Sequence, residues 1–305
     1  MRTFAACLVF TLCAVSATFA ADNLDHYFSY KEFDAYFREC GEYYEVPNCT
    51  LDEYIANAFP NEPEVQKLIH CTMIIFKGWQ DGSGVVEYVM SDFFNPAPED
   101  TCYADRTREC IQNSPAPCDT NTTLAYKAFQ CYYRQYGNLN QSRQFMPYTC
   151  REVQVLFETS IAIVNVPRCE LINYSNGQFL DQPNFADVMY VIFVRGGFYD
   201  LNLGLSLRNL YTQCGKPELL TPETQQCVDA ATAAWDGQKR KDLIYAIFVN
   251  CLQKTITFAQ ELQVVATSLV TGQPSPCPPP TTPPPPSPCT TSPPPPSTVP
   301  PCYNV

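Results

Sequence analysis

Apolar side chains recur at intervals of three and four residues along most of this chain, which is the spacing of amphipathic helices. One representative stretch begins with Asn61 as its expected N-cap and Pro63 in its first turn. The positions that share its apolar face are Val65, Leu68, Ile69, Thr72, Ile75 and Phe76. No stretch alternates apolar and polar residues for long enough to indicate a sheet. The sequence therefore predicts an all-α protein.

The same pattern occurs twice, with an offset of 120 residues that takes Cys49 to Cys169. The matched positions are Val46, Pro47, Gly84 and Cys131 in the first copy and Val166, Pro167, Gly204 and Cys251 in the second. In the second copy, Asp181 and Pro183 repeat the start of the representative helix. Solenoid repeats have periods of roughly 20 to 50 residues, so this offset indicates a duplicated domain.

Changes in composition predict where the domains begin and end. A polar stretch over 137–142 breaks the helical pattern, and a new amphipathic run starts near Thr149. Past Cys251 the helical spacing continues to about Val270, which predicts a long last helix whose apolar stripe is buried across the domain interface or over a pocket mouth. The predicted segments are a leader at 1–20, domains at 21–143 and 144–272, and a tail at 273–305.

The tail has a composition of its own, with 16 of the 28 prolines between Gln273 and Val305. Such a segment is expected to be disordered and extended, in polyproline II conformation and O-glycosylated. Its cysteines, Cys277, Cys289 and Cys302, are candidates for cross-links between chains, and a passive solvated stalk is the simpler interpretation. Ligand binding is therefore expected to need only the chain up to Gly272.

The first twenty residues resemble a cleavable secretory leader, with Arg2, an apolar run over 4–15 and a small residue at Ala20. The run is shorter than the roughly 20 apolar residues that a membrane span requires, so no membrane insertion is expected. Of the 17 cysteines, only Cys7 and Cys13 would leave with the leader. The 15 that remain predict a secreted, extracellular protein with disulfide bonds.

Charge and residue types exclude several functions. The net charge of −12 argues against nucleic acid as a partner. The only histidines are His26 and His70, and no motif supplies either with a catalytic partner. The chain has no G-x-S-x-G motif, no C-x-x-C pair and no glycine-rich phosphate loop. No enzymatic activity, metal site or cofactor is expected.

The cysteine spacing resembles that of the insect pheromone and general odorant-binding proteins, which carry six cysteines. In the first copy the first, third, fourth and sixth framework positions are Cys40, Cys71, Cys110 and Cys131, and the second and fifth are Lys67 and Thr122. In the second copy only Cys227 and Cys251 remain, and the second and fifth positions are Asp187 and Asp242. The second and fifth cysteines bond to each other in that family, so their joint loss leaves no orphan thiol. The resemblance is closest to the two-domain odorant-binding proteins of mosquitoes.

The resemblance implies two tandem six-helix, disulfide-bonded domains. It also implies the bridges Cys40 to Cys71, Cys110 to Cys131 and Cys227 to Cys251. The pairing of six other cysteines stays open: Cys49, Cys102, Cys118, Cys150, Cys169 and Cys214. If these six are oxidised among themselves, at least one bridge must join the domains, because each domain contributes three.

A helical domain fixed by disulfides can retain an apolar cavity, and 19 Phe and 19 Tyr supply apolar walls. The expected ligand-binding residues are Ile74, Val86, Val89, Met90, Phe93 and Phe129 in the first domain, and Met189, Ile192, Phe193, Leu207, Leu210 and Phe248 in the second. For any single one of them, ordinary core packing is the alternative interpretation. Since neither histidine is expected in a wall, ligand release should not follow histidine titration near pH 6.5.

These features favour a secreted carrier of small hydrophobic ligands, such as odorants, pheromones or fatty-acid-like lipids, with transport in olfaction as one setting. A scavenger of signalling molecules in saliva or reproductive fluid is a second version of the carrier. A structural or mucin-like extracellular interaction protein is the alternative from another class. The sequence leaves open the ligand, the tissue, and whether a membrane receptor or a second copy of the chain is a partner.

Overall fold

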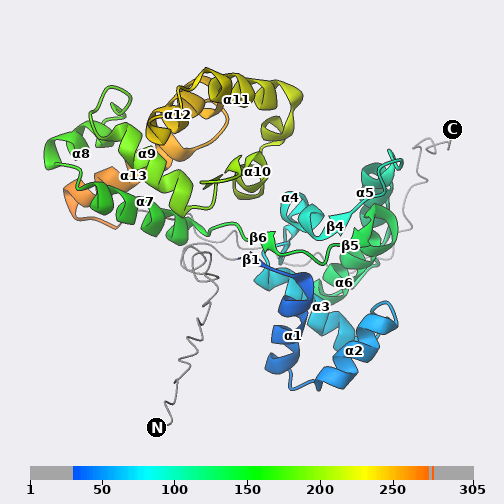
Figure 1. Cartoon of the computed structure of the whole chain (residues 1–305). Helices are drawn as coiled ribbons and strands as arrows, with labels where there is room; N and C mark the ends of the chain where they lie inside the picture. The colour runs from blue at the N-terminus through cyan, green and yellow to red at the C-terminus, as the bar shows by residue number, and fades with distance from the viewer. Residues whose placement is uncertain (1–29, 275–276, 278–305) are drawn as a thin grey trace, which may run out of the picture.

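The computed structural model describes residues 30–274 and Cys277, and its regular structure is almost entirely helical (Figure 1). The all-α prediction is confirmed. The first half comprises β1 (Tyr30–Lys31), α1 (Phe33–Tyr43), α2 (Asn48–Ala56), α3 (Pro63–Ile75), β2 (Trp79–Gln80), β3 (Gly84–Val85), α4 (Glu87–Met90), η1 (Ser91–Phe93), β4 (Phe94–Asn95), α5 (Tyr103–Asn113), α6 (Asn121–Cys131), η2 (Tyr132–Tyr136), β5 (Asn138–Leu139) and β6 (Gln144–Phe145).

The second half repeats this order with a longer C-terminal end. It comprises α7 (Cys150–Val164), α8 (Arg168–Ser175), α9 (Phe185–Arg195), β7 (Tyr199–Asp200), β8 (Gly204–Leu205), α10 (Leu207–Cys214), η3 (Pro217–Leu220), α11 (Pro222–Ala234), α12 (Arg240–Ile247), η4 (Phe248–Leu252) and α13 (Phe258–Thr271). No helix within residues 30–274 combines the length and apolarity that crossing a bilayer requires.

The repeated glycines mark the hairpins that follow α3 and α9. Gly84 has φ 88° and Gly204 has φ 85°, in the left-handed region that a residue with a Cβ rarely adopts. Each glycine starts the second strand of a two-stranded antiparallel hairpin, β2–β3 or β7–β8. The duplication thus preserves a turn whose geometry needs glycine.

The helix starts differ in detail from the prediction. The N-cap of α3 is Glu62, whereas the side chain of Asn61 accepts a hydrogen bond from Gln66 at 2.8 Å. In the second domain α9 begins at Phe185, beyond Pro183. The expected start near Thr149 is confirmed, because Thr149 caps α7 through a reciprocal pair of hydrogen bonds with Glu152.

The prediction of one long last helix is wrong. Helix α12 ends at Ile247, a π-helical turn follows over η4, and a separate helix, α13, begins at Phe258. The apolar stripe of α13 packs against α8 and α7 of its own domain rather than across the domain interface. Helical spacing therefore predicted a buried stripe correctly, but it did not show the break in the backbone.

The buried apolar side chains of the described residues form two separate cores. In the first, Phe33 lies at the centre, with its ring 5.4 Å from that of Phe129 and 6.0 Å from that of Phe59. In the second, Phe258 packs 5.6 Å from Phe193. Both cores are dominated by buried aromatic rings, which supply much of the apolar area that stabilises the fold.

The segment that joins the domains contributes to both cores. Phe145 is buried in the second core, whereas the next residue, Met146, is buried in the first. Strand β6 pairs with β1, so two segments distant in the sequence lie side by side between the domains (Figure 1). Tyr30 of β1 accepts a hydrogen bond from Asn209 at 2.7 Å. The junction is thus a packed interface.

A buried carboxylate of the first domain contacts α10 of the second. Asp92, only 6% exposed, pairs with Arg208 and accepts a hydrogen bond from the Thr212 hydroxyl at 2.5 Å. Nearby, the rings of Tyr88 and Tyr211 lie 6.0 Å apart in an edge-to-face arrangement. Burial raises the pKa of the Asp92 carboxyl, despite the opposing effects of Arg208 and Thr212.

This raised pKa predicts an unusual pH dependence for the Asp92 contribution. Above its folded-state pKa the carboxylate is charged and desolvated, so its ionisation opposes folding at neutral pH. As pH falls from 7 towards 4.5, wild-type protein should therefore gain stability relative to Asp92→Asn, which has no proton to bind. Urea unfolding of both proteins at the two pH values measures the difference. Asp52→Asn, the same change on an exposed side chain, is the control, and a relative loss for wild type on acidification would contradict the expectation.

The three bridges implied by the cysteine framework are present: Cys40–Cys71, Cys110–Cys131 and Cys227–Cys251. A fourth bridge joins Cys150, the first residue of α7, to Cys277. Cys277 therefore does not cross-link chains here, in contrast to the expectation for the tail cysteines. Cys289 and Cys302 lie outside the described residues.

The other cysteines fall into two groups. Cys118 is also disulfide-bonded. The unbonded cysteines among the described residues are Cys49, Cys102, Cys169 and Cys214. Of these, Cys214 is the most protected, because burial raises the pKa of its thiol to about 12. No bridge found among these residues joins one domain directly to the other.

Candidate ligand-binding pocket

A pocket of about 380 Å³ opens in the first domain between the β2–β3 hairpin, α5 and α6. This volume lies within the range of small-molecule sites. Apolar side chains form most of its wall: Trp79, Val85, Ile111, Pro115, Leu124, Ala128 and Tyr132. Polar groups lie around them: Ser83, Glu87, Arg108, Gln112, Ser114 and Lys127.

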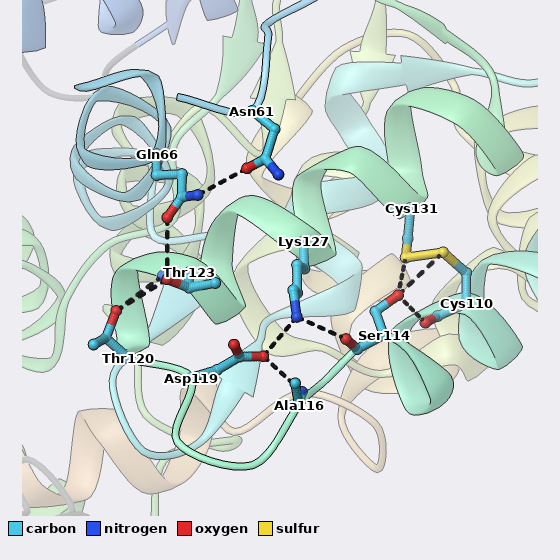
Figure 2. A network of polar contacts seen from close by, with 10 residues as sticks. All are labelled: Asn61, Gln66, Cys110, Ser114, Ala116, Asp119, Thr120, Thr123, Lys127 and Cys131. Atoms are coloured by element: carbon cyan, nitrogen blue, oxygen red, sulfur yellow. Dashed lines mark hydrogen bonds and ion pairs between the residues drawn. A yellow bond between two sulfur atoms is a disulfide. The ribbon is translucent and has the colours of Figure 1, made fainter. Parts of the chain in front are cut away.

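One disulfide bond and one helix cap hold the pocket-lining helices α5 and α6 in position. Cys110 near the end of α5 is bonded to Cys131 at the end of α6, so the two helices that line the pocket cannot separate. Thr120 caps α6 by accepting from the backbone N–H of Thr123. The Ser114 hydroxyl donates to the Cys110 carbonyl at 2.5 Å and lies 3.3 Å from the Cys131 sulfur (Figure 2).

Hydrogen bonds replace the bridge that the framework lacks between α3 and α6. Gln66 of α3 accepts from the Thr123 hydroxyl of α6 at 3.0 Å and donates to Asn61, a chain of contacts seen in Figure 2. In the second domain, both carboxylate oxygens of Asp187 lie 2.8 Å from the Lys241 ammonium. Each domain thus joins the two helices that the missing disulfide would have joined.

Lys127 of α6 fixes the loop at the pocket edge. Its ammonium donates to the Ser114 carbonyl at 3.0 Å and to Asp119 at 2.7 Å, and Asp119 also accepts from the backbone N–H of Ala116 at 2.6 Å (Figure 2). Burial opposes the ionisation of Asp119, but the hydrogen bonds from Lys127 and Ala116 outweigh it and lower the pKa of the carboxyl. The loop therefore carries a stable charged network.

A second cation lies at the pocket entrance. Arg108 of α5 pairs with Glu87 at 3.3 Å and with Asp105 at 2.8 Å, and half of its side chain is exposed. Both cations of the lining are therefore neutralised by carboxylates. The entrance offers polar contacts without a strong net field, which suits a neutral or weakly polar ligand better than a multiply charged one.

The lining also includes a neutral polar group, the phenol of Tyr132. Tyr132 is 1% exposed, and burial raises the pKa of its phenol, so the hydroxyl stays protonated. An apolar ligand carrying one oxygen atom could therefore be oriented by this group.

His70 lies behind the pocket wall rather than in it. Its Nε2 atom is 2.8 Å from Asp81, and the same carboxylate oxygen accepts from the indole N–H of the wall residue Trp79 at 2.8 Å. Burial opposes ionisation of Asp81, but hydrogen bonds from His70 and Trp79 lower the pKa of its carboxyl overall. Sequence reasoning did not detect this indirect link between a histidine and the wall.

We expect a His70→Ala protein and the wild type to show the same probe affinity at each pH from about 7.5 to 5. The reason is that His70 does not line the pocket, and the wall residue Trp79 bonds directly to Asp81. Titration of a fluorescent hydrophobic probe in pH steps tests this. A sharp loss of affinity near pH 6.5 in the wild type that disappears in the variant would contradict it.

None of the predicted ligand-binding residues of the first domain lines this pocket. Ile74 is 44% exposed on α3, so its predicted place in an internal wall is wrong. Val86 is partly buried against the core. The remaining four are core residues less than 2% exposed: Val89, Met90, Phe93 and Phe129. Their contact with a ligand stays a prediction.

The predicted residues of the second domain also lie in its core: Met189, Ile192, Phe193, Leu207, Leu210 and Phe248. The pattern of Tyr126 and Phe129 in α6 recurs as Tyr245 and Phe248, so Ala128, which lines the first pocket, corresponds to Ile247, which is 1% exposed. Phe248 is fully buried and its ring lies 5.9 Å from that of Phe185. The second domain therefore has a larger buried side chain at the position where the first has an alanine beside its pocket.

The actual wall was missed because its members do not form one apolar stripe. Trp79 and Val85 belong to a hairpin, and Ala128 is too small to mark a pocket in an apolar pattern. A usable signal existed in the repeat itself. Where the second copy has Ile247, the first has alanine, and a smaller side chain at a matched position can leave space.

The architecture defines a class: a small all-α domain, fixed by disulfides, with a mostly apolar pocket between its helices. Residues 29–135 match the model of the PBP/GOBP family. Over 202 residues the chain is 22% identical to "General odorant-binding protein 69" of Anopheles gambiae, which covers 62% of this chain and 86% of that protein. No solved structure gives a significant match.

Residues 29–135 therefore carry a domain of the PBP/GOBP family, and the chain is similar to an insect odorant-binding protein. This match confirms the resemblance that the cysteine spacing indicated. It assigns the protein to small-ligand carriers. The pocket and the family match lie in the first domain. Of the three framework bridges, two lie in the first domain and one lies in its repeat.

Proposed function

We propose that this protein is a secreted carrier that binds one small hydrophobic molecule in the pocket of its first domain and catalyses no reaction. The pocket beside Ala128 supports this proposal most directly, because it is mostly apolar and of suitable volume. The leader-like residues 1–20, which lie outside the described residues, and the four disulfides between described cysteines favour an extracellular location.

The proposed ligand has an apolar body and at most one or two hydrogen-bonding groups. The body would contact Trp79, Ile111 and Leu124, and a carbonyl or hydroxyl oxygen would reach Tyr132. Odorants, pheromones and fatty-acid-like lipids fit this description. In this proposal the second domain, with Ile247 in place of Ala128, stabilises the first rather than binding the same ligand.

Native mass spectrometry of the protein purified from a secreting cell tests the proposal together with probe binding. We expect retained hydrophobic ligand or uptake of one molecule of N-phenyl-1-naphthylamine per chain at micromolar concentration. Trp79→Ala should weaken uptake, whereas Trp235→Ala in the second domain should not. If the intact protein neither retains a ligand nor takes up the probe, the structural or mucin-like interpretation is favoured instead.

A further inference from the structure

The loop that joins α11 to α12 carries a concentration of positive charge in an acidic chain. Lys239, Arg240 and Lys241 are the only three consecutive basic residues of the sequence, whose net charge is −12. The two helices that the loop joins pack against each other in the second domain (Figure 1). Because the charge here is opposite in sign to that of the whole chain, attraction of an anion to this loop would be a local property.

A groove of about 570 Å³ lies beside this loop. Its volume is within the range of small-molecule sites. The lining consists of the loop, Trp235 just after α11, and two side chains of α9, namely Asp187, Tyr190, Trp235, Gly237, Gln238, Lys239, Arg240 and Lys241. All of these residues belong to the second domain, so the groove is separate from the pocket beside Ala128.

Only one of the three cations in the lining is paired with a carboxylate. The ammonium of Lys241 lies 2.8 Å from both carboxylate oxygens of Asp187. Among the described residues, Lys239 and Arg240 form no ion pair. The lining contains three cations and one carboxylate, so its net charge is +2. Two adjacent unpaired cations favour a ligand that brings negative charge.

Local hydrogen bonds fix the backbone of the loop. The Asp236 carboxylate accepts from the backbone N–H of Gln238 at 2.9 Å, and the indole N–H of Trp235 donates to the Lys239 carbonyl at 3.2 Å. Gly237 has φ 82°, and a Cβ at this position would meet no atom within 4 Å. The loop is therefore held in one shape with open space beside it, and the ring of Trp235 is fixed next to the basic residues.

Aromatic rings supply the apolar part of the groove. Trp235 and Tyr190 are both partly buried against the core of the second domain, so each ring is supported from behind. The corresponding loop of the first domain, residues 114–120, contains no basic residue and carries Asp119 instead. The combination of two rings with two unpaired cations thus belongs to the second domain.

We propose that this groove binds a small organic anion whose negative group is attached to a planar ring. The carboxylate, sulfate or phosphate contacts Arg240 and Lys239, and the ring packs against Trp235. A guanidinium can bind an oxyanion through two parallel hydrogen bonds, which gives the site direction as well as charge. A long polyanion fits less well, because it would extend from the groove over a surface that is acidic overall.

Trp235 can report the binding itself. The chain has two tryptophans, so Trp79→Phe leaves Trp235 as the only one in the full-length protein. We expect para-nitrobenzoate to quench its fluorescence with saturation at one molecule per chain, because nitroaromatic rings quench indole on contact. The neutral analogue para-nitrobenzyl alcohol should need at least a tenfold higher concentration. Raising NaCl from about 20 to about 300 mM should weaken quenching by the benzoate only.

Two phosphates distinguish the preferred anion and the role of the ring. If para-nitrophenyl phosphate binds more tightly than para-nitrobenzoate, the oxyanion that the site prefers is a phosphate. If the benzoate binds more tightly, it is a carboxylate. Inorganic phosphate alone should compete at least tenfold more weakly than para-nitrophenyl phosphate. Equal competition would mean that Trp235 contributes nothing and would overturn the proposed ring contact.

Charge removal tests the assignment of the cations. Lys239→Gln and Arg240→Gln should each weaken para-nitrobenzoate binding about three- to fivefold, and both together about tenfold or more, as expected for exposed ion pairs. Lys254→Gln is the matched control, because it removes one charge from an exposed side chain of the same domain outside the lining. Isothermal titration calorimetry of the same variants with Trp79 retained repeats the comparison without the Trp79→Phe change.

Three results would overturn the proposal. The benzoate and the alcohol could quench Trp235 equally, the double variant could bind like the wild type, or a heparin fragment could displace the small anions and depend on the same cations, which would assign the groove to a polyanion. Uptake of N-phenyl-1-naphthylamine by the wild-type chain reports on the first pocket separately. A chain that binds the benzoate at Trp235 but takes up no probe disproves only the carrier proposal, and the opposite result disproves only the anion site.

Discussion

Replacing Ala128 by phenylalanine should remove most of the probe affinity while leaving the protein folded. Ala128 is 4% exposed on α6 and lines the pocket, so a ring at this position would enter the space of about 380 Å³ that a ligand needs. We expect affinity to fall at least tenfold, or about 1.4 kcal/mol. Inserting a larger side chain into a filled core lowers protein stability by about 1–3 kcal/mol. The loss of stability in Ala128→Phe should be near or below the lower end of this range, because the pocket already provides space for the ring.

Two further substitutions test the reasoning behind this expectation. Phe248→Ala removes a buried ring from the core of the second domain, and should cost about 3–5 kcal/mol of stability because it creates a cavity in a filled core. It should leave probe uptake by the first domain intact. Ala162→Phe places the same ring on the exposed face of α7 and should change neither property. Wild-type affinity in Ala128→Phe would show that the probe binds elsewhere.

Much of the fold could be predicted because its signals are local or are repeated. The start of α7 follows from Thr149 and Glu152, which satisfy each other's backbone groups within one turn. The bridges Cys40–Cys71 and Cys110–Cys131 followed from a family spacing that survives in the first copy. The joint loss of the second and fifth framework cysteines was consistent with that spacing. The structure shows polar contacts between the helices that carry these two positions in each domain.

The last helix and the pocket wall could not be predicted from spacing alone. A stripe at helical intervals shows that one face is buried, but it does not show which element covers it or whether the backbone stays continuous from Leu252 to Phe258. The pocket depends on what is absent at Ala128 and on a hairpin, a loop and two helices meeting in space. Such a space is a property of packing between distant segments.

The bridge from Cys150 to Cys277 shows a similar limit. Nothing in the sequence connects a cysteine at the start of α7 with one in a proline-rich segment, so the tail seemed dispensable beyond Gly272. The structure instead bonds this segment to the second domain across a sequence separation of 127 residues. A long closed loop removes much of the freedom of the unfolded chain, so this bridge should contribute more stability than Cys110–Cys131, with its separation of 21 residues.

A chain that ends at Cys277 should therefore be more stable than one that ends at Gly272, by about 3–5 kcal/mol. Both lack the rest of the tail, so their difference isolates the bridge and the five residues that carry it. Denaturant unfolding followed by circular dichroism measures the two free energies.

The matched control is Cys150→Ser in each chain. It should destabilise the longer chain by nearly the whole difference and leave the shorter one almost unchanged, because the shorter chain has no partner for Cys150. Equal stability of the two chains would mean that α13 is fixed by its packing on α8 and α7 alone. The bridge would then serve to position the start of the tail on the second domain rather than to stabilise the fold.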